Sequence, residues 1–205
     1  MKKTKDKILA AALKLFNKQG VAGVSIRQIA KETGISHGNL IYHFRNKEEI
    51  IQGLHAQLLE HAIKINSKID RVNFDISGLY DATYNGFNVV YDFRFMFFDL
   101  LYIVNTDPLM RTSLMEVEKI RSAMYSEVIA LSIDHGLMRK GEYSGEYEEL
   151  IKRIKIYSDH WITSAAIYEK LKKDALIREY ANLFMGHFYP YLTVKGKRRL
   201  KNKAH

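Results

Sequence analysis

The chain has 205 residues, of which 47% are hydrophobic, a share that suits a globular protein with a sizeable core and excludes a disordered or collagen-like chain. It contains no cysteine, so disulfide frameworks and thiolate metal sites are also excluded. The net charge of +9 is concentrated at the two ends, because residues 1–50 carry ten basic against four acidic side chains and residues 195–205 carry six against none. A basic N-terminal segment beside a mildly acidic body favours a polyanion partner, although solvated lysines on a helix surface would give the same charge.

The apolar residues recur mostly at intervals of three and four, which predicts an all-α fold. A first helix is expected from Thr4, which caps it, to Gly20, which ends it. A second helix is expected after Ser25, where Gln28 completes a capping box, and Gly34 ends that helix. These four short signals place two helices in the first 34 residues.

The turn at Gly34 leads to a third helix, which Ser36 caps. A helix, a glycine turn and a second capped helix are the pattern of a helix-turn-helix motif. Leu40 and Phe44 are four residues apart and face the core, so the neighbouring polar residues point outward, where a recognition helix meets DNA bases. Asn46 caps a fourth helix. The outward residues of the third helix are His37, Gly38, Asn39, Tyr42 and His43.

One combination of residues extends over this segment: Leu15-Phe16, Gly20, Ser25, Ile29-Ala30, Gly34-Ile35-Ser36, Gly38, His43-Phe44 and Lys47-Glu48. With it, the first quarter of the chain resembles the DNA-binding domain of the TetR/AcrR family of bacterial transcriptional regulators. One position departs from the family pattern, since Ile41 stands where an aromatic residue is common and Tyr42 follows it. The resemblance implies an all-α homodimer in which three helices bind DNA, a fourth connects, and a divergent C-terminal domain dimerises and usually binds a small effector.

The resemblance also implies which residues contact DNA. Ser25 and Lys47 would bind phosphates, and Arg27 would lie near the backbone or an edge base. The amide of Asn39 can pair bidentately with an adenine, accepting from its N6 amino group and donating to N7, and His37 would donate to a guanine or only to a phosphate. Alternatively, His43 bonds within the domain and Lys47 is a solvated lysine. The full predicted set is Ser25, Arg27, Ser36, His37, Gly38, Asn39, Tyr42, His43 and Lys47.

Beyond the DNA-binding segment, apolar residues from Ile50 to Ile69 predict one long connecting helix. After an irregular stretch, an aromatic helix is expected over about Leu79 to Asn105, with Arg94 on its apolar side. A guanidinium on an inward face needs an anion. That anion is either a structural carboxylate such as Glu116, Glu127 or Asp159, or an anionic effector; otherwise the side chain reaches solvent.

The aromatic stripe of this helix is core or, in part, the wall of an effector pocket. The candidate effector residues are Phe87, Tyr91, Arg94, Phe98, Tyr102, Met124, Tyr125 and Trp161. Asp107 and Pro108 start a further helix that runs to Gly136. A weakly ordered connection is expected over 137–146, with Ser144 starting the next helix.

The last two helices carry more apolar surface than one subunit needs, which predicts a four-helix dimer interface. Alternatively, a long loop or the connecting helix covers this surface. The candidate interface residues are Ile156, His160, Thr163 and Ile167 on one helix, and Ala181, Phe184, Met185 and Phe188 on a final helix of about Ala175 to Tyr191.

We therefore expect a helix-turn-helix DNA-binding domain at 1–47, a helical ligand-binding and dimerisation domain at 48–194 and a basic, disordered tail at 195–205. The sequence has no metal-ligand spacing, no phosphate-binding loop and no nucleophile motif, so it predicts no metal, no cofactor, no enzyme and no membrane span. The expected function is a cytoplasmic, dimeric regulator that binds double-stranded DNA at an inverted repeat, more often a repressor, released by a small hydrophobic or anionic effector. The alternatives are an architectural DNA-binding dimer without an effector, and an enzyme or lipid carrier that keeps such a domain.

Overall fold

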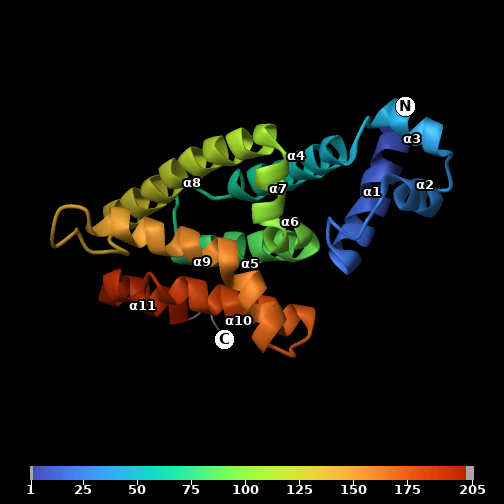
Figure 1. Ribbon diagram of the computed structural model, residues 1–205. Helices are drawn as coiled ribbons and strands as arrows, with labels where there is room; N and C mark the ends of the chain where they lie inside the picture. The colour runs from blue at the N-terminus through green and yellow to red at the C-terminus, as the bar shows by residue number, and fades with distance from the viewer. Residues whose placement is uncertain (1, 202–205) are drawn as a thin grey trace. The chain divides into compact units, whose positions relative to one another are not determined.

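The structure is a computed structural model that describes residues 2–201, and in this range all regular elements are helices apart from one isolated bridge between Met138 and Leu192 (Figure 1). The all-α prediction is confirmed. The helices are α1 (Lys2–Gln19), α2 (Ile26–Thr33), α3 (His37–His43), α4 (Lys47–Asn66), α5 (Ile76–Asp92), α6 (Phe95–Phe98), α7 (Leu100–Thr106), α8 (Pro108–Asp134), α9 (Glu146–Tyr168), α10 (Lys173–Gly186), the 3-10 turn η1 (Tyr189–Tyr191) and α11 (Val194–Lys201).

The chain divides into two compact units. The first comprises Met1–His61 and Asp92–Thr112, and the second comprises Ala62–Tyr91 and Ser113–His205. Helices α4 and α8 both pass from one unit to the other. The first unit therefore contains the helix-turn-helix segment together with α6 and α7, which come from a distant part of the sequence.

In the first unit, α1, α2 and α3 pack around a small apolar core. Ile8 and Phe16 of α1, Ile29 of α2 and Leu40 of α3 are all buried. Leu40 and Phe44 face inward as their spacing predicted. One local prediction is wrong, because α1 begins at Lys2 and Thr4 lies within the helix instead of capping it.

The predicted aromatic helix of residues 79–105 is wrong, because the chain breaks twice. Helix α5 ends at Asp92, α6 begins at Phe95, and α7 follows after Asp99. At the first break the Asn17 amide donates to the Asp92 carbonyl (2.7 Å) and accepts from the Phe95 N–H (3.1 Å). These bonds replace helical ones, so Arg94 lies in the break, immediately before α6, and not on the apolar face of a continuous helix.

In the second unit, α9 packs against α10 (Figure 1), and their facing side chains form an aromatic core. Trp161 of α9 stacks on Phe87 of α5 with ring centroids 4.6 Å apart, and Phe184 of α10 meets Phe87 edge-on at 5.6 Å. The α10 prediction needs a boundary correction, because the helix runs from Lys173 to Gly186 and a 3-10 turn follows.

The connection from α8 to α9 is tightly held, contrary to the prediction of weak order. Arg139 donates through both terminal nitrogens to the Glu146 carboxylate (2.9 and 2.6 Å), and Leu137 and Met138 are buried. Ser144 does not start α9. Instead Gly145, with φ +91°, precedes the helix, a backbone conformation that suits glycine.

The predicted disordered tail of residues 195–205 is wrong in its first part, because residues 194–201 form α11. Leu200 and Gly196 of this helix are buried, and a side chain at Gly196 would clash with the Leu137 carbonyl. The remaining residues of the predicted tail, 202–205, lie outside the described residues. The helix therefore packs through Leu200 and the close approach of Gly196, while its basic side chains point outward.

Candidate nucleic-acid interface

The candidate nucleic-acid interface is the outer face of α3. Ser36 caps the helix by accepting from the Asn39 N–H (3.1 Å), and buried Leu40 and Phe44 anchor its inner face. His37, Gly38 and Asn39 are exposed, and Tyr42 is 73% exposed. A short rigid helix thus presents hydrogen-bonding groups outward, a geometry that suits insertion into a DNA groove.

His43 lies differently from its neighbours on α3. It is half-buried, its ring meets the Tyr42 ring edge-on (5.3 Å), and its Nδ1 is buried without a hydrogen-bond partner. The Nδ1 atom therefore points away from the exposed face. Of the five residues predicted to face a groove, four are exposed and His43 is the exception.

Ser25 and Arg27 are exposed at the start of α2. The predicted capping box is confirmed, because the Ser25 hydroxyl accepts from the Gln28 N–H (3.3 Å) and the Gln28 side chain accepts from the Ser25 N–H (2.7 Å). Backbone N–H groups at the start of a helix favour anions. The start of α2 is thus a suitable place for a phosphate.

Lys47, the other predicted phosphate ligand, is held by the chain itself. Its ammonium group donates to the carbonyls of Val21 (2.8 Å) and Val24 (3.3 Å), both in the loop between α1 and α2. Asn46 caps α4 as predicted, by accepting from the Glu49 N–H (2.8 Å). The Glu49 carboxylate in turn accepts from the Arg45 N–H (2.8 Å).

Sequence reasoning missed two residues that fix this surface, Asn17 and Asp99. The Asp99 carboxylate accepts from the Val21 N–H (2.7 Å), and the two residues are 78 positions apart. No local pattern marks such a contact, because neither residue has an unusual spacing or neighbour.

The candidate effector residues fall into both units. Phe87, Tyr125 and Trp161 are buried in the aromatic core of the second unit, while Met124 is half-buried. The ring of half-buried Tyr91 carries the Lys173 ammonium 5.1 Å from its centroid. In the first unit Arg94 is half-buried, and Phe98 and Tyr102 are each 42% exposed.

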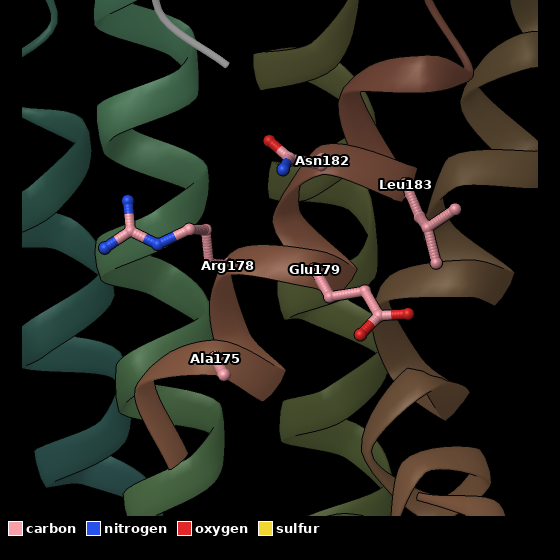
Figure 2. Close-up of a pocket in the computed structure, with 5 residues that line it drawn as sticks. All are labelled: Ala175, Arg178, Glu179, Asn182 and Leu183. Atoms are coloured by element: carbon pink, nitrogen blue, oxygen red, sulfur yellow. The ribbon is translucent and has the colours of Figure 1, made fainter. Parts of the chain in front are cut away.

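Three of the candidate dimer residues of α9 are at the surface, since Ile156 is 56% exposed, Ile167 is 66% exposed and His160 is exposed, whereas Thr163 is half-buried with its hydroxyl covered. The interface assignment on the predicted final helix is wrong, because these side chains fill the core of their own subunit: Ala181, Phe184 and Met185 of α10, and Phe188, which follows it. The outer face of α10 instead lines a shallow groove of about 490 Å³ (Figure 2). The groove residues are Ala175, Arg178, Glu179, Asn182 and Leu183.

Comparison with known proteins identifies the family. The profile described as bacterial regulatory proteins, tetR family, matches residues 8–54, and a profile described as bacterial transcriptional repressor matches residues 54–200. The chain belongs to the TetR family. It is therefore a DNA-binding transcriptional regulator and not an enzyme, and its DNA-binding domain is the helix-turn-helix segment. In the described residues no helix is long and apolar enough to cross a membrane.

Three similar proteins illustrate the relationship. IcaR of Staphylococcus epidermidis, a negative transcriptional regulator of the biofilm operon icaADBC, is 25% identical over 193 residues, which cover 93% of this chain and 97% of IcaR. A TetR-family regulator from Marinobacter aquaeolei VT8 has the same fold with a TM-score of 0.88 at 22% identity, covering 97% of this chain and 96% of that one. A regulator from Saccharomonospora viridis, solved with choline, has a TM-score of 0.73 at 18% identity, covering 91% and 97%.

Proposed function

We propose that this TetR regulator is a homodimeric repressor in the cytoplasm that binds an inverted-repeat operator with the α3 helices of both copies. The observation that carries the proposal is the exposed polar face of α3 above buried Leu40 and Phe44. Repression is supported by the match of residues 54–200 to a transcriptional repressor and by the similarity to the negative regulator IcaR. Ser25, Arg27, Ser36, His37, Gly38, Asn39, Tyr42 and Lys47 would contact DNA, while His43 would support the helix from inside.

The two copies would place their α3 helices about 34–36 Å apart, the spacing of successive major grooves on one side of B-DNA. The exposed apolar side chains Ile156 and Ile167 of α9 and Leu183 of α10 support a dimer formed by these two helices. An effector that binds better to a conformation with another spacing would release the repressor, to the extent of its differential affinity.

A small-molecule effector is supported by the choline complex of the structural neighbour and by the aromatic content of the second unit. In the second unit Tyr91 would contribute a partly exposed ring; in the first unit Phe98 and Tyr102 are partly exposed rings, and Arg94 is a cation that would suit an anionic effector there. The effector site would lie within the second unit, where the deeply buried Phe87, Tyr125 and Trp161 would form its base and Met124 would line it.

A second candidate function is an architectural DNA-binding dimer without an effector. It is favoured by the stacking of Phe87 on Trp161 and the edge contact of Phe87 with Phe184, since rings that pack against one another are ordinary core. A thermal-shift screen of hydrophobic, anionic and quaternary-ammonium metabolites separates the two functions. A compound that raises Tm and releases DNA supports the repressor, because a ligand that binds the folded state stabilises it.

The DNA-binding proposal is tested by enrichment of random duplexes on the full chain, followed by fluorescence anisotropy with the enriched sequence. We expect an inverted repeat and an affinity at least about 10³-fold above that for unrelated duplex DNA at the same salt. Enrichment of no sequence, with equal affinity for all duplexes, would exclude a sequence-specific regulator.

A further inference from the structure

The backbone of Val21, in the loop between α1 and α2, is held from two sides. Its N–H donates to the Asp99 carboxylate (2.7 Å), and its carbonyl accepts from the Lys47 ammonium (2.8 Å). The Val21 side chain is fully buried. The backbone of Val21 is therefore hydrogen-bonded to a carboxylate on one side and to an ammonium group on the other. Hydrogen bonds to charged groups are stronger than those between neutral groups.

The hydrogen bonds of Lys47 extend along the loop to the start of α2. Lys47 also donates to the Val24 carbonyl (3.3 Å), and Val24 directly precedes Ser25, the capping residue of α2. Because Val21 and Val24 are both tied to Lys47, the loop has little freedom to move relative to the start of α4. The positions of Ser25 and Lys47, the two proposed phosphate ligands, are therefore coupled to each other through this loop.

Asp99 is fixed in turn by the end of α1. Asn17 bonds to both sides of the break between α5 and α6, at the Asp92 carbonyl and the Phe95 N–H. The buried rings of Phe16 and Phe95 lie 5.2 Å apart. The segment that ends in Asp99 is thus attached to α1 by two hydrogen bonds and a ring contact, all within the first unit.

The residue before Val21 is adapted to the Asp99 carboxylate. Gly20 has φ +72°, a conformation that side chains disfavour, and a Cβ there would lie 3.3 Å from Asp99 Oδ2. Glycine at this position both ends α1 and leaves room for the carboxylate. The turn and the contact with Asp99 therefore depend on the same residue.

We propose that Asp99 is a positioning residue for DNA binding: by accepting from the Val21 N–H, it fixes the loop that places Ser25 and Lys47 at the DNA phosphates. The inference rests on the proposed DNA-binding surface. Asp99 lies between α6 and α7. A movement of these helices would therefore shift the loop between α1 and α2, and with it the DNA-binding surface. Asp99 itself does not touch DNA.

The test compares Asp99→Ala, Asp99→Asn and Asp134→Ala in the full chain, with anisotropy on the duplex enriched by the unaltered protein. We expect Asp99→Ala to weaken binding about tenfold, because the loop loses a charge-assisted hydrogen bond. Asp99→Asn keeps an oxygen acceptor and should recover binding to within about threefold. Asp134→Ala removes an exposed carboxylate of α8 and should leave the affinity unchanged.

Affinity of Asp99→Ala equal to that of the unaltered chain would overturn the proposal, as would an Asp99→Asn variant as weak as Asp99→Ala. If Asp99→Ala does not fold, Gly20→Ala replaces it. A Cβ at Gly20 presses on Asp99 while the carboxylate remains. Unchanged DNA affinity of Gly20→Ala would also overturn the proposal. Amide hydrogen exchange at Val21 needs no DNA, so it tests the contact even if no operator is enriched and the proposed function fails. We expect faster exchange in Asp99→Ala, and equal rates would contradict the contact.

Discussion

Among the exposed side chains of α3, Asn39 has the chemistry best suited to base recognition. Its backbone N–H is used by the Ser36 cap, while its side chain is exposed and lies in the first turn of the helix. An amide group can donate to and accept from one adenine, whereas Tyr42 offers a single hydroxyl and Gly38 only its backbone. We therefore expect Asn39 to be the main base-contacting residue of the proposed interface.

Asn39→Ala should weaken binding to the enriched operator by about 1–3 kcal/mol, because one bidentate base contact is lost. Binding to unrelated duplex DNA should not change, since that binding depends on phosphates. Anisotropy titrations on both duplexes measure the difference, with Asn85→Ala, an exposed asparagine of α5, as the matched control. An undiminished preference for the operator would refute the role of Asn39.

Lys47 has two roles that one variant can separate. Lys47→Ala should lower the free energy of unfolding by about 1–2 kcal/mol, because the carbonyls of Val21 and Val24 lose a donor. If its ammonium also binds a phosphate, the slope of log affinity against log salt should fall by about one. Urea unfolding and a salt titration measure the two effects, and Lys31→Ala, at an exposed position of α2, is the control. A solvated lysine would change neither quantity.

At the scale of elements, local sequence signals located several helix boundaries. The capping box of Ser25 and Gln28, the cap at Ser36 and the Asp107-Pro108 start of α8 are all present in the structure. Each signal depends on residues within three positions of each other, so the local sequence is enough to place these helix starts. The breaks between α5, α6 and α7 have no such signal, since Asn17 and Asp99 act across more than 70 residues.

The break after α5 predicts a stabilising role for Asn17. Asn17→Ala should lower the free energy of unfolding by about 1–3 kcal/mol, because the Asp92 carbonyl and the Phe95 N–H lose their partner. Asn17→Asp keeps the acceptor for the Phe95 N–H but not the donor to the Asp92 carbonyl. Its free energy of unfolding should therefore lie between those of the parent chain and Asn17→Ala. Urea unfolding of the three proteins gives the comparison, and an Asn17→Ala variant as stable as the parent would argue against this role.

The hairpin between α8 and α9 predicts a dependence on acid. Hydrogen bonds from Arg139 and from the Glu142 N–H lower the pKa of Glu146 to about 2, from an ordinary value of 4.5. A carboxylate whose pKa is lowered by folding stabilises the folded state at pH values above its ordinary pKa. This stabilisation is lost as the pH falls from about 4.5 towards 2. The free energy of unfolding of the parent chain should therefore fall more steeply over this range than that of Glu146→Gln.

Denaturant unfolding followed by circular dichroism between pH 6 and pH 2 measures this difference. Glu142→Gln is the matched control, because the Glu142 side chain is 70% exposed and its carboxylate lies farther from Arg139 (3.3 Å). The free energy of unfolding of Glu142→Gln should change with pH as that of the parent chain does. Parallel curves for the parent and Glu146→Gln would show that the Arg139–Glu146 contact does not contribute.

At the scale of the whole molecule, the proposed dimer depends on the outer faces of α9 and α10. Leu183 is 52% exposed on α10, and Figure 2 shows it beside Glu179 on the groove. Leu183→Glu should give particles of 23.8 kDa in light scattering in place of particles of twice that mass, because a charge would be buried in an apolar interface. Operator affinity should fall with it, since two linked α3 helices bind more tightly than one.

Leu101→Glu is the control for this experiment, because Leu101 is 77% exposed on α7, in the first unit and outside the proposed interface. We expect it to remain dimeric. A Leu183→Glu variant with the mass of a dimer would exclude the α10 face as the interface.

By itself, the sequence determined the helical class, the helix-turn-helix and the exposed face of α3, because periodicity and caps act between residues a few positions apart. Only the tertiary structure decided where the aromatic segment breaks, that Lys47 is tied to the loop between α1 and α2, and which face of α10 is buried. Phe184 and Phe188 lie on an apolar stripe that suits a partner subunit or the core equally well. The choice depends on which distant residues fill the space around them, and this is a property of packing that no short stretch of sequence contains.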